Sequence, residues 1–300
     1  MISNSSLVLG TAQIGFPYGI ANKTGQPSQT VATDIIREAW ECGIREFDTA
    51  HAYGVSEKVL GIALAQLGLS DQAIVITKLN PIFDHLDAKV MEGALRESIA
   101  RLGVEKLSGV LLHKEDLLPL WHKGLADIFS GFVAQGLVKK VGISVYSPQK
   151  AIDALNTDGI DMVQVPTNLL DNRFEKAGVF SLAREKKKIV YVRSVFLQGL
   201  ILINPAEIPE HLAFAAGVIE KIESLAHKLK ISRKELALGY VKYAVPDARI
   251  VLGVDLPSQV RDNCLLWESV KQSSLISQAR ELFPAVDERI LNPAQWIEKK

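Results

Sequence analysis

The chain has 300 residues, of which 34 are basic and 34 acidic, so its formal net charge at pH 7 is zero. A balanced charge gives no electrostatic attraction to nucleic acid or to anionic lipid, and we predict neither partner. The two cysteines, Cys42 and Cys264, form no metal-binding spacing and favour a reducing compartment over a disulfide-bonded protein, so we predict no metal site.

The first residues, MISNSSLVLGTAQIG, lack the basic region and the long apolar run of a signal peptide. The chain also lacks a run of about 18 apolar residues, which a membrane-spanning helix requires. These features predict a cytoplasmic protein.

Eight short runs along the chain are rich in β-branched and other apolar residues. Most of them are almost continuously apolar, which is typical of parallel strands buried on both faces. The eight predicted strands are 7–12, 45–50, 73–79, 109–113, 139–145, 162–168, 188–194 and 249–255.

Helical patterns alternate with these runs. Asp87 can cap one helix and Gly103 can end it, and the Ser232 to Glu235 spacing forms a capping box at the start of another. The predicted helices are 33–43, 87–103, 147–155 and 232–246. On 87–103, the apolar residues expected to share one side are Val90, Ala94, Leu95, Ile99 and Leu102.

The alternation of strands and helices predicts an α/β protein with a (β/α)8 TIM barrel, formed by residues 1–300 as a single domain. A doubly wound sheet is the alternative. That fold usually carries a GxGxxG fingerprint after its first strand, and the corresponding segment GTAQIGFPYG does not contain one.

Four residues with complementary chemistry lie at or just after predicted strand ends: Asp48, Tyr53, Lys78 and His113. Catalytic groups of a barrel project from the carboxyl ends of its strands. An ammonium beside a phenol lowers the phenol pKa, so we expect Lys78, held by Asp48, to make Tyr53 a better general acid. Considered separately, Asp48 and Lys78 would more often form a structural ion pair, and Tyr53 and His113 would more often serve packing in the core or a loop. Their coincidence at three consecutive strand ends favours a proton-transfer site.

Six segments resemble the aldo-keto reductase superfamily, in the same order along nearly the whole chain: FDTAHAYG, ITKL, LLHKED, VGISVYS, VQVPTNLLDNR and LGVDLPSQVRDN. The resemblance implies a barrel that binds NADPH, less often NADH, and reduces aldehydes and ketones. By the same resemblance, Tyr53 is the general acid, Lys78 and Asp48 tune it, and His113 orients the substrate carbonyl. The oligomeric state is not predicted.

The resemblance also assigns cofactor residues. Ser144 and Gln164 match positions that hold the nicotinamide carboxamide, although Val145 replaces the asparagine that usually follows. Arg193 replaces a tyrosine that stacks on the nicotinamide ring, and a planar guanidinium can also stack. The other predicted cofactor residues are Gly10, Thr11, Phe196, Leu197, Gln198, Gly199, Gly253, Asp255, Gln259, Asp262 and Asn263.

The position of Asp255 bears on the choice of cofactor. Relatives often carry Ser, Lys or Arg in this turn to hold the 2′-phosphate of NADPH, and a carboxylate would repel that phosphate. Arg261 is a candidate to compensate. The family default makes NADP(H) the predicted cofactor, with NAD(H) as the close alternative.

The loops predict a small carbonyl substrate of polar character, such as a sugar-like carbonyl compound. The candidate substrate residues are Phe16 and Tyr18, in the long first loop 13–28, together with His113. Two alternatives stay open. One is a cofactor-sensing regulatory or interaction protein on the same fold. The other is an unrelated barrel lyase or aldolase in which Lys78 forms a Schiff base.

Overall fold

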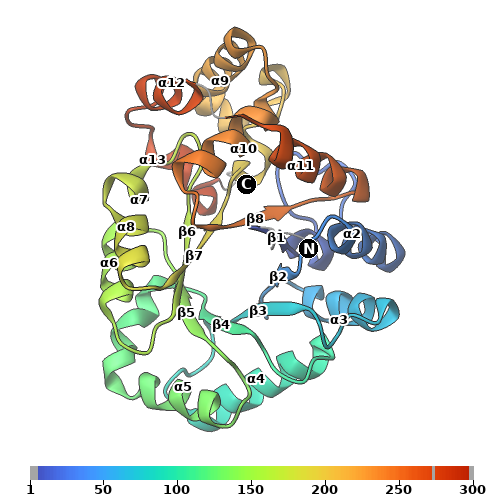
Figure 1. Ribbon diagram of the computed structural model, residues 1–300, viewed down its shortest axis with the longest axis vertical. Helices are drawn as coiled ribbons and strands as arrows, with labels where there is room; N and C mark the ends of the chain where they lie inside the picture. Colours follow the sequence, from blue (N-terminus) through green and yellow to red (C-terminus); the bar gives the residue numbers. More distant parts are fainter. Residues whose placement is uncertain (1–5, 272–273, 297–300) are drawn as a thin grey trace.

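The structure, a computed structural model, describes residues 6–271 and 274–296. Eight parallel strands close into a barrel in sequential order, and Figure 1 shows them ringed by helices. The strands are β1 (Leu7–Gly10), β2 (Glu46–Asp48), β3 (Ile74–Leu79), β4 (Gly109–Leu112), β5 (Val141–Ser144), β6 (Met162–Pro166), β7 (Ile189–Arg193) and β8 (Arg249–Gly253). All eight predicted strands and the TIM-barrel fold are confirmed. That residues 1–300 form a single domain stays a prediction.

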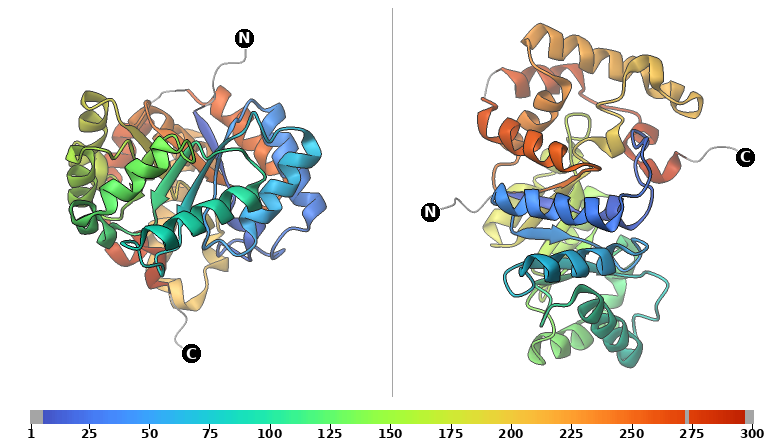
Figure 2. Two further views of the ribbon diagram at one scale, coloured as in Figure 1. Left: turned by 90° about the horizontal axis from the view of Figure 1, so that it is seen from below. Right: turned by 90° about the vertical axis from the view of Figure 1, so that its right-hand side faces the viewer.

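Helices connect successive strands and cover the outside of the barrel. The views of Figure 2 show α2 and α3 (blue) as neighbours on this outer layer. The α-helices are α1 (Ala12–Gly15), α2 (Gln29–Glu41), α3 (Ser56–Leu67), α4 (Ala88–Leu102), α5 (Leu125–Ala134), α6 (Pro148–Asn156), α7 (Arg173–Lys176), α8 (Val179–Glu185), α9 (Ala216–Leu229), α10 (Arg233–Ala244), α11 (Pro257–Ser269), α12 (Leu275–Leu282) and α13 (Glu288–Leu291). The 3₁₀ helices are η1 (Glu115–Lys123), η2 (Leu197–Gly199), η3 (Pro205–Glu207), η4 (Glu210–Ala215) and η5 (Pro293–Gln295).

The predicted helix caps are largely confirmed. Asp87 accepts hydrogen bonds from the first turn of α4, and Gly103 ends that helix in the left-handed conformation. Ser232 caps α10 by accepting from the backbone N–H of Glu235. The start of α2 was predicted wrongly: the helix begins at Gln29 rather than at 33, because Ser28 caps it.

The core has two layers. A large outer layer lies between strands and helices, and a small inner layer fills the barrel with Val8, Ile76, Leu111, Met162, Tyr191 and Val251. Met162 lies against Gly109 and Gly142, where an added Cβ would come within 2.4 Å of its Cε and 2.2 Å of its carbonyl oxygen. These glycines leave the space that Met162 fills, so the barrel is a packed core.

Polar side chains occupy the barrel on both sides of the apolar inner layer. On β2, Glu46 accepts a hydrogen bond from the Tyr191 hydroxyl at 3.0 Å and pairs with Arg249, at the start of β8, at 3.4 Å. Two residues later, Asp48 ends the same strand. Side chains two residues apart share one face of a strand, so Asp48 lies towards the carboxyl ends of the strands, where the candidate site is.

Among the helices that the structure describes, none is both long enough and apolar enough to cross a lipid bilayer.

Candidate active site

The four predicted catalytic residues come together at the carboxyl ends of the strands. Asp48 ends β2, Lys78 lies in β3, His113 follows β4, and Tyr53 lies in the turn between β2 and α3. A cavity of about 530 Å³ is lined by Asp48, Tyr53 and His113 together with most of the predicted cofactor residues.

Lys78 and Asp48 form a buried ion pair. The Lys78 ammonium lies 2.7 Å from both Asp48 carboxylate oxygens and 3.1 Å from the Thr49 carbonyl oxygen. Lys78 is 1% exposed and Asp48 4%. Gln164 adds a third hydrogen bond to Asp48 through its Nε2, at 2.8 Å. Burial lowers the pKa of Lys78, and the negative charge of Asp48 opposes that shift. The pair is therefore a fixed part of the site.

Tyr53 lies beside this pair. The Lys78 ammonium is 4.9 Å from the centroid of the Tyr53 ring, and the His113 ring meets it edge-on with centroids 5.6 Å apart. The expectation of a lowered Tyr53 pKa is wrong: burial and the charge of Asp48 raise it, and Arg193 opposes the shift. Burial is the largest cause of this shift, because the phenolate would lose its hydration.

His113 is held in its neutral form. Burial and the positive charges of Lys78, Arg193 and Lys114 lower its pKa to about 3. Its Nδ1 is buried and has no hydrogen-bond partner among the described residues. A neutral imidazole has one N–H donor and one acceptor nitrogen, so His113 can hydrogen-bond a ligand in the cavity.

Three further buried polar atoms on the cavity lack partners within the described part of the chain: Gln164 Oε1, Arg193 Nη2 and Asn263 Oδ1. A buried polar atom without a partner is costly, so these atoms mark places where a polar ligand would be hydrogen-bonded. Gln164 and Asn263 each retain a free amide oxygen, the acceptor that a carboxamide or an adenine amino group requires. The residues present therefore fit a nicotinamide dinucleotide.

All but one of the predicted cofactor residues line the cavity. Asp262 is exposed on α11 and does not line the cavity, so its contact with the cofactor stays a prediction. The predicted residues that line the cavity are Gly10, Thr11, Ser144, Gln164, Arg193, Phe196, Leu197, Gln198, Gly199, Gly253, Asp255, Gln259 and Asn263. Val145 is fully buried in the outer core, so its side chain offers the cavity no hydrogen bond.

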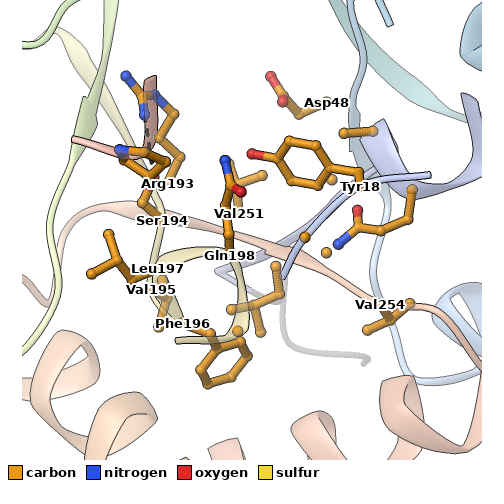
Figure 3. Close-up of a pocket in the computed structure, with 18 of the residues that line it drawn as sticks. Tyr18, Asp48, Arg193, Ser194, Val195, Phe196, Leu197, Gln198, Val251 and Val254 are labelled. Carbon is orange, nitrogen blue, oxygen red and sulfur yellow. Dashed lines mark hydrogen bonds between the residues drawn. The ribbon is translucent and has the colours of Figure 1, made fainter. Parts of the chain in front are cut away.

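The segment after β7 has unusual backbone geometry. Ser194, Leu197 and Gln198 have φ angles of 62°, 49° and 54°, a left-handed region that costs energy for residues with a side chain. Asn168 holds this turn by donating to the Ser194 carbonyl at 3.0 Å, and the backbone N–H of Ile20 donates to the Gln198 carbonyl at 3.0 Å. Figure 3 shows the segment along one side of the cavity, with Tyr18 across from it and its hydroxyl directed towards Gln198. Leu197 and Gln198, two of the predicted cofactor residues, therefore belong to a strained turn on the cavity.

The turn after β8 contains Asp255, which lines the cavity and accepts a hydrogen bond from Asn22 at 3.1 Å. Burial raises the pKa of Asp255. Arg261 does not compensate for its charge, because it forms hydrogen bonds to Glu38 at 2.8 and 2.5 Å on the protein surface and does not line the cavity.

On the substrate side, Tyr18 lines the cavity but Phe16 does not. Phe16 packs edge-on against Tyr18, with ring centroids 5.5 Å apart. The centroid of its ring also lies 6.3 Å from that of Tyr53. It therefore supports both tyrosines. A neighbouring pocket of about 490 Å³ shares His113, Tyr146 and Ala294 with the cavity and includes the polar residues Lys114, Glu115 and Asp116.

Several cavity residues were absent from the predicted site, among them Gln13, Asn22, Tyr146 and Lys234. Tyr146 had a signal in the sequence, because it lies two residues beyond Ser144 in VGISVYS. Lys234 and Asn22 had none, since they come from the first turn of α10 and from the first loop, and only the fold brings them to the strand ends.

Comparison with known proteins identifies the family. The model of the aldo/keto reductase family matches residues 6–282. The chain belongs to the aldo/keto reductase family. It is 24% identical over 297 residues to the NADH-specific methylglyoxal reductase of Escherichia coli (strain K12), an alignment that covers 87% of this chain and 89% of that protein. It is 26% identical over 209 residues to the aldo-keto reductase YhdN of Bacillus subtilis (strain 168), covering 67% and 61%.

Among solved structures, the glycerol dehydrogenase AKR11B4 of Gluconobacter oxydans superposes with a TM-score of 0.74 at 21% identity, covering 99% of this chain and 94% of that one. The predicted resemblance to the aldo-keto reductases is thus confirmed. The protein is an NAD(P)H-dependent oxidoreductase that reduces a carbonyl group.

Proposed function

We propose that this aldo/keto reductase reduces a small aldehyde or ketone to an alcohol with Tyr53 as the proton donor. The observation that carries the proposal is the placing of Tyr53 and His113 on a cavity next to the buried Lys78–Asp48 pair. The partnerless amide oxygens of Gln164 and Asn263 on the same cavity support a bound nicotinamide dinucleotide.

When bound in reduced form, the nicotinamide supplies the hydride that adds to the carbonyl carbon. The carbonyl oxygen then gains negative charge and needs a proton. Tyr53 carries its proton at neutral pH, as a phenol with a pKa of about 10 or above does, so the proton is available to the oxygen. Burial and Asp48 raise its pKa, and the positive charge of Arg193 opposes that shift. Neutral His113 can donate a hydrogen bond to the same oxygen and so hold the carbonyl in place. The Lys78–Asp48 pair forms a rigid part of the site next to the Tyr53 ring.

For the cofactor, the site favours NADH over the NADP(H) of the family default. Asp255 puts a carboxylate on the cavity, and Arg261, the cation expected to balance it, is bound to Glu38. A 2′-phosphate beside Asp255 would meet repulsion, whereas a free ribose hydroxyl could be hydrogen-bonded. The name of the Escherichia coli relative, an NADH-specific reductase, agrees with this choice.

The test is a titration followed by turnover. Tryptophan fluorescence is measured while NADH or NADPH is added, and the preferred cofactor is then oxidised by a panel of small polar aldehydes and ketones. We expect saturable binding with a preference for NADH, and carbonyl-dependent loss of nicotinamide absorbance. Binding without turnover would favour the regulatory alternative. Turnover or covalent trapping of a carbonyl compound on Lys78 by borohydride, without any nicotinamide, would favour the lyase.

A further inference from the structure

Arg193 is a cation on the cavity and has no anionic partner in the described part of the chain. Its Nη1 donates to Ser194 Oγ at 3.2 Å, while its Nη2 is buried and has no partner within the described residues. Other arginines near the barrel contact carboxylates, such as Arg101 with Glu57 at 2.7 Å and Arg173 with Asp171 at 2.8 Å. A buried guanidinium edge that lacks both an ion pair and a hydrogen bond is costly.

No carboxylate that lines the cavity is available to Arg193. Asp48 accepts hydrogen bonds from Lys78 and Gln164, and Asp255 accepts one from Asn22. In the neighbouring pocket, the Glu115 carboxylate accepts from the backbone N–H groups of Tyr146 and Ser147, at 2.7 and 2.9 Å. An anionic ligand in the cavity would therefore supply the charge that these carboxylates do not.

The position of the guanidinium is fixed. It stacks on the Tyr146 ring, with its central carbon 4.2 Å from the ring centroid, and Glu115 holds the backbone of Tyr146. Stacking occupies one face of the guanidinium, and Nη1 is bound to Ser194. Nη2, on the N–H edge that binds carboxylates, has no partner among the described residues. The site is thus organised in advance to bind an anion at one edge.

Arg193 shares its cavity with the proposed catalytic groups. Arg193 lines the cavity together with Tyr53 and His113, and Figure 3 shows it across from Tyr18 with Gln198 between them. Its charge is also felt by the catalytic groups. Burial and Asp48 raise the pKa of Tyr53 and Arg193 lowers it, and burial, Lys78 and Arg193 together lower the pKa of His113. A substrate whose carbonyl lies at Tyr53 and His113 would place a nearby group at Arg193.

We propose that Arg193 binds a carboxylate carried by the substrate itself, so that the preferred substrates are short oxo acids: aldehydes or ketones with a carboxylate a few carbons away. This inference rests on the proposed carbonyl reduction and names its substrate class. Tyr146 and Glu115 are positioning residues, which hold the guanidinium with its edge free.

The test compares acids with their methyl esters, which differ only in charge. Glyoxylate, succinic semialdehyde and glutaric semialdehyde, each paired with its methyl ester, are assayed at fixed ionic strength with saturating cofactor. We expect the acid to exceed its ester in kcat/KM by at least about tenfold for the chain length that fits, as a charge-assisted hydrogen bond should provide. In Arg193→Leu this ratio should fall to about one, and Arg193→Lys should keep part of it. Because the acid and the ester are assayed with the same variant, a general loss of activity cancels in the ratio of their kcat/KM values.

Lys114 supplies the matched control, because it is an exposed cation next to His113 in the neighbouring pocket. Lys114→Met should keep the acid-to-ester ratio of the parent protein. A ratio that survives in Arg193→Leu but is lost in Lys114→Met would overturn the proposal. So would a parent protein that reduces acids no faster than esters, or an Arg193→Leu variant that weakens only cofactor binding.

A second readout does not depend on turnover. Oxamate, succinamate and glutaramate replace the reactive carbonyl with an amide, and their binding to the protein with saturating oxidised cofactor is measured by calorimetry. We expect one of them to bind the parent protein and to bind Arg193→Leu at least about tenfold more weakly. If an amide acid binds but no carbonyl compound is reduced, the result supports the carboxylate site and contradicts the proposed carbonyl reduction. If esters are reduced but acids are neither preferred nor bound, the result supports the proposed carbonyl reduction and contradicts the carboxylate site.

Discussion

At the scale of single residues, the most specific prediction about stability concerns the Lys78–Asp48 pair. Both side chains are buried, and they satisfy each other at 2.7 Å. Lys78→Met would leave a carboxylate buried with only the Gln164 hydrogen bond, at a cost of about 3–5 kcal/mol in the free energy of unfolding. We therefore expect a lower melting temperature as well as lost activity, measured by thermal unfolding and by turnover.

The control for this prediction is the double variant Lys78→Met, Asp48→Leu. Replacing a buried pair with apolar groups is often nearly neutral, so the double variant should recover much of the stability and none of the activity. A Lys78→Met protein with the stability of the parent would contradict the assignment of a buried pair.

The neutral state of His113 predicts how activity and stability depend on pH. Its pKa of about 3 lies far below the ordinary value near 6.5, so its ring stays neutral in the folded protein throughout the neutral range. The kcat/KM for carbonyl reduction should show no step near pH 6.5 that belongs to this residue. The same shift makes His113 reduce stability as pH falls from about 6.5 towards 3, because only the unfolded chain takes up the proton there. A step near pH 6.5 that disappears in His113→Asn would contradict the neutral assignment.

At the scale of elements, the sequence predicted the strands better than the helices. The strands are buried on both faces, so their apolar runs are short and uninterrupted, and only the ends shift by a residue or two. On α4 the predicted apolar side was partly wrong, since Val90 is 38% exposed and Met91 is fully buried. A helix at the barrel surface has a broad boundary between its buried and exposed sides, and one position around the helix is enough to move a residue across it.

The turn between β8 and α11 carries the residue on which the proposed preference for NADH rests. Replacing Asp255 with Ser removes a carboxylate from the cavity, so it should tighten NADPH binding by up to roughly tenfold and leave NADH nearly unchanged. The measurement is a pair of fluorescence titrations at fixed ionic strength. Glu268→Ser, an exposed carboxylate later on α11, is the matched control for net charge and should change neither affinity. An unchanged NADPH-to-NADH ratio in Asp255→Ser would show that the carboxylate does not face the ribose.

At the scale of the whole molecule, the candidate site was predictable where it depends on strand order and unpredictable where it depends on burial or on distant contacts. Parallel strands place Asp48, Lys78 and His113 at one end of the barrel, and the sequence alone locates them there. The pKa of Tyr53 moves opposite to the expectation because desolvation appears only in the folded chain. The contact of Asn22 with Asp255 likewise spans most of the sequence and leaves no local pattern.

The proton donor is the most direct test of the proposed mechanism. Tyr53→Phe and Tyr18→Phe each remove one hydroxyl from the same cavity, and kcat is measured for both with the preferred cofactor and a reducible aldehyde. We predict that Tyr53→Phe lowers kcat by at least about 100-fold with cofactor affinity nearly unchanged, while Tyr18→Phe loses much less. Near-normal turnover by Tyr53→Phe, together with a collapse of turnover in Tyr18→Phe, would contradict the assignment and move the proton donor to the first loop.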